Sequence, residues 1–224
     1  MNATLSQHVQ IPADSGFLEG MLELPPNARG VVIFAHGSGS SRFSPRNNFV
    51  AEKLRDGRVG TLLVDLLLPD EEFVYESRFD IALLTRRLAT VAAWVAESRA
   101  ASDLPLGLFG ASTGAAAALR VAAAERTPIA AVVSRGGRPD LAGATALANA
   151  RAPTLLIVGS EDRGVIELNQ SVYEMLRCEK RIELVSGATH LFEEPGTLAR
   201  AASLARQWFE RHLRADIGAF AFMR

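Results

Sequence analysis

Six short runs of mostly apolar residues, many of them β-branched, recur along the chain. They cover residues 31–37, 61–66, 105–110, 129–135, 153–159 and 181–187. Apolar runs with little alternation are typical of strands that are buried on both faces of a parallel sheet. We therefore predict that these runs form the centre of such a sheet.

Longer stretches with apolar residues at helical spacing separate the runs, at 49–58, 79–97, 114–124, 165–176 and 198–213. Alternating strands and helices indicate an α/β fold in which helices cover both faces of a mostly parallel sheet. Before the first run, residues 7–11 and 17–24 flank the turn sequence PADSG and predict an antiparallel hairpin at one sheet edge. The sheet should then have about eight strands.

Length and composition favour one domain that spans residues 1–224, because 224 residues with 48% hydrophobic side chains can bury one core. The net charge is −1, and the arginines form no run, which argues against a nucleic-acid partner. Only Cys178 is available for a disulfide, and the N-terminus has neither a basic start nor a signal-length apolar stretch. These features predict a cytoplasmic address.

No apolar segment reaches the roughly 18 to 20 residues that span a bilayer, so no membrane association is expected. The apolar segment 217–223 could pack on the domain surface, near the site or on a second subunit. The sequence therefore leaves a homodimer as one possibility.

Ser112 is the candidate nucleophile. It lies in the motif GASTG at 110–114, directly after an apolar run and directly before a helical stretch. In a GxSxG motif the serine occupies a strained strand-to-helix turn, which requires small residues two positions to either side, and Gly110 and Gly114 meet that requirement. The helix N-terminus behind the turn would stabilise negative charge near the serine. The alternative is an ordinary flexible turn.

His190 is the candidate base. Where this motif is catalytic, the acid and then the base follow the serine along the chain, and only His190 and His212 follow Ser112. His212 lies among charged residues near the end of the last helical stretch, where the helix dipole accounts for it. His190 lies in a loop after the last strand, from which its ring can reach the sheet end. The alternative is a histidine of a surface loop.

Asp162 is the candidate acid, because it follows the run 153–159 by three residues and its short side chain can turn back to the imidazole N–H. Glu161 would point more naturally to solvent. Asp140, which follows the run 129–135, is the competing acid. It is better explained as the N-cap of a helix over 141–150.

The loop 36–42, HGSGSSR, follows the first run and is the candidate oxyanion loop. Stabilising an oxyanion requires two backbone N–H groups, for which we expect Ser38 and Thr113. His36 begins this loop, and we assign it to the substrate-binding region, where it holds the loop by a hydrogen bond and transfers no proton.

The same loop also supports a dinucleotide-dependent oxidoreductase as an alternative, since Gly37-x-Gly39 follows a strand and Asp65 ends the next one. The third glycine of that fingerprint is absent, with Arg42 in its place. This alternative also leaves the GxSxG motif unexplained.

Arg135 ends a predicted strand beside two glycines and is a candidate substrate-binding residue. An arginine in this position would attract a substrate that carries a carboxylate. It could equally pair with Asp140 or Glu193 and hold the loop.

Over nearly its whole length the sequence resembles the dienelactone-hydrolase-like family of α/β-hydrolases. The resemblance rests on HGSGSSRFSPRN (36–47), the GASTG elbow, SRGGRPDLA (134–142), LLIVGSED (155–162) and GATHLFEEPG (187–196). It implies an α/β-hydrolase fold and acyl-ester hydrolysis by Ser112, Asp162 and His190 without a metal or cofactor. Only 136–152 separates two neighbouring runs, so no large cap domain is expected.

One departure from the family concerns the nucleophile. Dienelactone hydrolases carry cysteine in the elbow, whereas this chain has Ser112 and its lone Cys178 lies elsewhere, which argues against dienelactone as the substrate. Similar domains also occur fused to phosphoribosyltransferases, and the sequence shows no such partner domain. We expect a carboxylesterase or lactonase that acts on small esters, and a non-catalytic ligand-binding protein on the same scaffold is the alternative.

Overall fold

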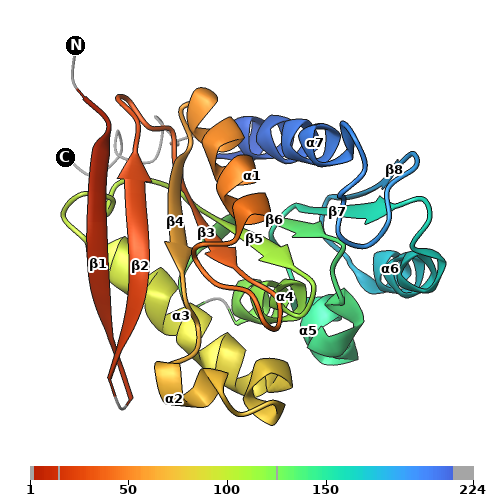
Figure 1. Cartoon of the computed structure of the whole chain (residues 1–224), viewed down its shortest axis with the longest axis horizontal. Helices are drawn as coiled ribbons and strands as arrows, with labels where there is room; N and C mark the ends of the chain where they lie inside the picture. The colour runs from red at the N-terminus through yellow and green to blue at the C-terminus, as the bar shows by residue number, and fades with distance from the viewer. Residues whose placement is uncertain (1–2, 15, 125, 214–224) are drawn as a thin grey trace, which may run out of the picture.

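The computed structural model describes residues 3–14, 16–124 and 126–213, and its centre is an eight-stranded sheet in the order β1-β2-β4-β3-β5-β6-β7-β8 (Figure 1). The strands are β1 (Leu5–Ala13), β2 (Gly16–Leu24), β3 (Val31–Ala35), β4 (Gly60–Val64), β5 (Leu106–Ala111), β6 (Ile129–Arg135), β7 (Thr154–Gly159) and β8 (Lys180–Val185). Strands β1 and β2 form the antiparallel hairpin, β2 pairs antiparallel with β4, and the remaining pairs are parallel. The predicted α/β fold is confirmed.

Helices cover both faces of the sheet, which is why every residue of β3, β4, β5 and β7 is buried. One face packs against α1 (Pro45–Asp56) and α7 (Thr197–His212), whose apolar residues share a core with Phe34, Phe109 and Val133. The other face packs against α3 (Ile81–Glu97), α4 (Gly114–Ala123), α5 (Ala144–Asn149) and α6 (Arg163–Met175) (Figure 1).

Two helices begin three or more residues away from the predicted position. Helix α1 starts at Pro45 instead of residue 49, because the Ser44 side chain accepts the Asn47 N–H and proline suits the first helical position. Helix α5 starts at Ala144, since Gly143 at φ 85° interrupts the backbone between it and the 3-10 turn η2 (Pro139–Ala142).

The connections leave the carboxyl end of the sheet without a large cap. Only η2 and α5 lie between β6 and β7, and the connection after β4 contains the short helix α2 (Pro69–Glu72) and the turn η1 (Glu76–Phe79). In the part of the chain that the structure describes, no helix has the length and apolarity needed to cross a membrane. The segment 217–223 lies outside the described residues.

Candidate active site

Ser112 lies on a sharp turn between β5 and α4, with a left-handed backbone at φ 49°. This turn requires the two flanking glycines. A Cβ atom on Gly110 would lie 2.4 Å from the Cα of Ala115, and one on Gly114 would lie 2.1 Å from the carbonyl oxygen of Ala35. The close passage of strand, turn and helix therefore forces Ser112 into a conformation that L-residues rarely adopt.

Two loops hold the Ser112 turn in place. The Arg138 N–H donates to the carbonyl oxygen of Ser112 at 2.9 Å, from the loop that follows β6. On the other side, a Cβ atom on Gly37 would lie 2.8 Å from the Cβ of Ser112, so the glycine-rich loop 36–42 runs directly against the serine. Ser112 itself is partly exposed.

His190 and Asp162 are joined by a hydrogen bond of 2.7 Å between Nδ1 and Oδ2. The Asp162 side chain is 16% exposed and the His190 side chain 40% exposed. Their loops interlock, since the Glu161 N–H donates to the Ala188 carbonyl at 2.9 Å. With its Nδ1–H donated to Asp162, the imidazole keeps a lone pair on Nε2, which is the form that can accept a proton.

The segment 136–138 connects the histidine to the serine. Gly136 has φ 51°, and a Cβ atom there would lie 3.0 Å from the His190 carbonyl oxygen and 3.8 Å from its Nδ1. Two residues later, Arg138 forms the hydrogen bond to Ser112. Ser112 and the His190–Asp162 pair therefore lie at the same edge of the sheet, against the same loop.

Asp140 is engaged elsewhere. Its two carboxylate oxygens accept from Nε and Nη2 of Arg138 at 2.9 and 2.8 Å. The interpretation of Asp140 as a helix N-cap is wrong, because it lies within η2 and Gly143 precedes α5. The ion pair with Arg138 satisfies its charge and leaves it no role toward His190.

Ser38 and Thr113 lie on the two segments that approach each other at Ser112. Ser38 is exposed and directly follows Gly37, and Thr113 is buried at the start of α4. Neither backbone N–H is bonded to another backbone group among the described residues. Both N–H groups are thus free to donate to an oxygen atom beside Ser112.

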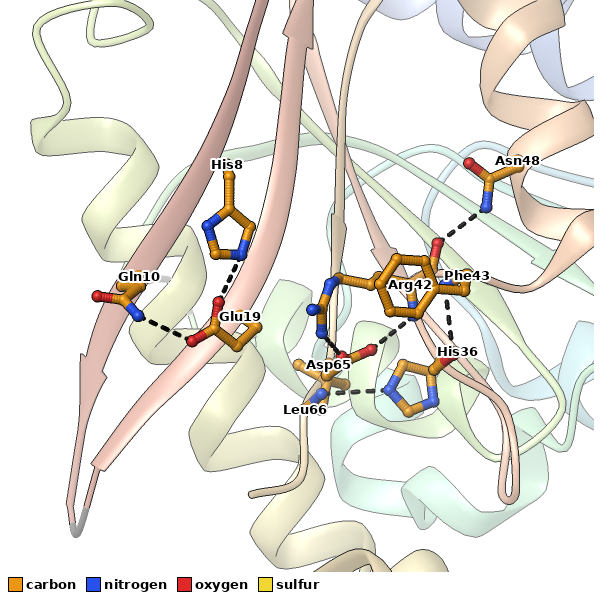
Figure 2. A network of polar contacts seen from close by, with 10 residues as sticks. His8, Gln10, Glu19, His36, Arg42, Phe43, Asn48, Asp65 and Leu66 are labelled. Carbon is orange, nitrogen blue, oxygen red and sulfur yellow. Dashed lines mark hydrogen bonds and ion pairs between the residues drawn. The ribbon is translucent and has the colours of Figure 1, made fainter. Parts of the chain in front are cut away.

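The loop 36–42 is fixed at both ends by the carboxyl end of β4 (Figure 2). At its start, the Leu66 N–H donates to His36 Nε2 at 3.2 Å, and His36 Nδ1 lies 3.0 Å from the Gly37 carbonyl oxygen. At its end, Asp65 accepts the Arg42 N–H at 2.6 Å and also binds the Arg42 guanidinium.

The expectation that His36 holds the loop by a hydrogen bond is confirmed, since the residue is 5% exposed and both of its ring nitrogens are used by the backbone. No ring nitrogen is left to bind a substrate. Asp65 is bound by its own chain, so it is not available to a ribose, and the dinucleotide alternative loses its acid. Sequence reasoning missed the role of Asp65, although its position at a strand end was a signal.

Arg135 is buried at the end of β6 and makes neither of the two pairings weighed for it. Asp140 is bound to Arg138, and Glu193 is bound to Arg46 at 3.1 Å. The contacts of Arg135 are with Asn47 and the Phe192 ring. Among the described residues, no group of three or more histidine, cysteine or acidic side chains could hold a metal ion.

Comparisons with known proteins place the chain in a family. No protein-family model matches the sequence. A dienelactone hydrolase from Anabaena variabilis is 46% identical, with a TM-score of 0.91 over 95% of this chain and 100% of that one. The protein XC6422 of Xanthomonas campestris, described as an α/β serine hydrolase without a lid, is 22% identical with a TM-score of 0.73 over 92% of this chain and 94% of its own, and shows the fold alone.

Two proteins of Mycobacterium tuberculosis, from strains CDC 1551 / Oshkosh and H37Rv, are provisionally named phosphoribosyl transferases. Both are 52% identical to this chain over 207 residues. The match covers 92% of this chain but only 46% of theirs, so the chain spans about half the length of these relatives. Since the dienelactone hydrolase from Anabaena variabilis is matched over its full length at 46% identity, the chain belongs to the dienelactone-hydrolase-like family of α/β-hydrolases.

Proposed function

We propose that this protein hydrolyses small carboxylic esters through a covalent acyl-enzyme formed on Ser112. The observation that carries the proposal is the left-handed backbone of Ser112 at φ 49°. Such a conformation costs about 1 to 3 kcal/mol, persists only where the surrounding structure over-determines it, and is frequent at active sites. Here it presents a serine at the same sheet edge as a histidine that is already bonded to a carboxylate, with both residues against the segment 136–138.

The mechanism follows from the groups around the serine. His190 Nε2 takes the Ser112 proton as Oγ attacks the ester carbonyl, and Asp162 orients the imidazole and stabilises the imidazolium. The oxyanion accepts hydrogen bonds from the Ser38 and Thr113 N–H groups at the positive end of α4. His190 then protonates the leaving alcohol, and water, activated by the same histidine, releases the acid.

Small esters fit this site better than long-chain lipids. Selectivity for long acyl chains needs a deep apolar slot, because each buried methylene contributes about 0.8 kcal/mol. The connection between β6 and β7, which holds only η2 and α5, leaves little chain to build one. The alternative, a ligand-binding protein without turnover, keeps the scaffold but needs no activated serine.

Covalent labelling with a fluorophosphonate, followed by intact-protein mass spectrometry, tests the proposal. The unmodified chain should gain one phosphonyl group, and Ser112→Ala should gain none. Ser171→Ala removes an exposed serine of α6 and should label like the parent. Labelling of Ser112→Ala at the parent rate, or ligand binding without any acyl-enzyme from p-nitrophenyl acetate, would overturn the proposal.

A further inference from the structure

The Arg135 guanidinium is buried without a carboxylate partner among the described residues. The residue is 7% exposed, and its Nη2 lies 3.5 Å from the Asn47 Oδ1, at the outer limit of a hydrogen bond. Its Nε and Nη1 atoms are buried and have no hydrogen-bond partner within the described ranges. The remaining contact is with the ring of Phe192, whose centroid is 5.7 Å from the guanidinium carbon.

This burial is unfavourable for the folded protein. Removing a charged group from water without pairing it costs several kcal/mol, and a cation–π contact restores only part of that. Burial, and after it the charge of Arg46, lowers the pKa of Arg135 to about 10. The side chain is therefore still charged at neutral pH, and its charge is left for a ligand to neutralise.

The groups around Arg135 add to the positive potential. Asn47 belongs to the first turn of α1, a helix of 12 residues, so the positive end of the helix dipole lies beside the guanidinium. Arg46, from the same turn, is close enough to depress the pKa of Arg135. Arg135, Arg46 and the first turn of α1 thus form a positive cluster. The carboxylate that contacts this cluster is that of Glu193, whose side chain is 63% exposed and binds Arg46, not Arg135.

The cluster lies next to the proposed nucleophile and base. Arg135 pairs in register with Ala111, the residue directly before Ser112, and neighbouring strands are only about 4.8 Å apart. Phe192, which the guanidinium contacts, lies two residues after His190. A substrate group bound by Arg135 would thus belong to a molecule whose ester reaches Ser112.

We propose that Arg135, Arg46 and the first turn of α1 form a binding site for an anionic oxygen group, a carboxylate or a phosphate, on the substrate. The assignment of that anion to the substrate rests on the proposed esterase function. In this site Glu193 acts as the resident competitor, because it occupies Arg46 when no ligand is bound. Guanidinium groups suit such anions, since their N–H donors match the geometry of carboxylate and phosphate oxygens.

Binding can be tested separately from turnover in the Ser112→Ala background. Succinate and inorganic phosphate are added, with sodium chloride at equal ionic strength as the control, and thermal unfolding is measured. At least one of the two anions should raise Tm, because a ligand that binds only the folded state stabilises it. Adding Arg135→Met should abolish the response, and adding Glu193→Gln should lower the concentration needed by about threefold or more.

The Tm without ligand separates a binding role from a structural one. If Arg135 is kept for ligand binding, Arg135→Met should raise Tm, because it removes a buried unpaired charge. A lower Tm together with an unchanged anion response would overturn the proposal. So would the same anion response in Arg135→Met and in the exposed-residue control Arg200→Met.

Kinetics on the protein with Ser112 intact then connect the site to catalysis. Arg135→Met should lose about tenfold more kcat/KM on monomethyl succinate than on methyl butyrate, and equal losses would refute the site. Anion binding in the absence of any esterase activity would leave the site standing and remove the proposed function. Esterase activity without anion selectivity would remove the site and leave the proposed function standing.

Discussion

Two arginines are buried in the part of the chain that the structure describes, and they differ in whether a carboxylate pairs with them. Arg87, on α3, is 2% exposed and donates to Glu71 Oε1 at 2.8 Å, with Asp14 3.9 Å from its Nε. Arg135 is 7% exposed, and among the described residues it contacts an amide oxygen and an aromatic ring but no carboxylate. The first arginine joins α2 to α3, whereas the second lies at the edge of the sheet that holds the site.

The difference extends to the backbone around each arginine. Beside Arg135, Ser112 and Phe192 have φ values of 49° and 58°, and Gly136 has 51°. Positive φ at a bulky residue such as Phe192 is a genuine outlier. Around Arg87, by contrast, the described residues of α2 and α3 have no positive φ value. Two of the four non-glycine residues with positive φ among the described residues therefore lie beside Arg135, and none lies in the helices around Arg87. Nε and Nη1 of both guanidinium groups have no hydrogen-bond partner among the described residues, so the carboxylate of Glu71 is what distinguishes Arg87.

Removal of the candidate base His190 should have the largest effect on activity, and it distinguishes the region of the site from the region of Arg87. His190→Ala is expected to lower kcat by 10⁴-fold or more, because triad members act as a unit, and to leave Tm nearly unchanged since the side chain is half-exposed. Steady-state hydrolysis of p-nitrophenyl acetate and thermal unfolding measure the two quantities. His8→Ala, at the exposed hairpin, is the matched control and should retain full activity.

Replacement of the acid should have the next largest effect. Asp162→Asn leaves the imidazole in the wrong tautomer, and we expect kcat to fall by up to about 10⁴-fold. Asp140→Asn breaks the ion pair with Arg138 and should reduce activity little. If instead Asp140→Asn inactivates the protein and Asp162→Asn does not, the acid is misassigned.

Breaking the pair at Arg87 should affect stability and spare catalysis. Arg87→Met leaves Glu71 without its cation, and we expect the free energy of unfolding to fall by about 2 kcal/mol, less than for a fully buried pair because Glu71 is partly exposed. For a chain of this size the Tm should drop by about 4 to 8 °C. Lys53→Met, from an exposed pair with Asp56, should change Tm by less than about 2 °C. A Tm increase for Arg87→Met would contradict the interpretation that Arg87 stabilises the fold and Arg135 does not.

The smallest effect concerns the rim formed by α2 and η1. Phe73 and Tyr75 are 87% and 65% exposed, and they lie among acidic residues, which suits a solvated rim and not a lipid-facing lid. In a p-nitrophenyl ester series, kcat/KM should be highest at acetate or butyrate and about tenfold lower at octanoate. A rise through dodecanoate, or a jump in rate above the micelle threshold, would show that these aromatics line an acyl groove.

The sequence alone was enough to predict the sheet and the position of the turn that carries Ser112. Runs of apolar residues predicted six of the strands, and burial on both faces explains the pattern in the central ones. The turn sequence PADSG and its flanks predicted the two strands of the hairpin. The small residues around Ser112 predicted the turn for a similar local reason, since a Cβ atom at Gly110 or Gly114 would collide with the neighbouring backbone. Helix α1 was placed four residues late, because the apolar spacing begins after its cap.

Only the tertiary structure determined which groups pair with the polar side chains. The contacts of His190 with Asp162, of His36 with Leu66 and of Arg135 with Asn47 all join residues far apart in the chain. The sequence around a polar residue has no periodic pattern that identifies its hydrogen-bond partner. The free energy of burying such a residue depends on whether neighbours in the folded chain satisfy its hydrogen bonds and charge. The sequence could therefore name Arg135, but only the folded chain showed that no carboxylate of the described residues pairs with it.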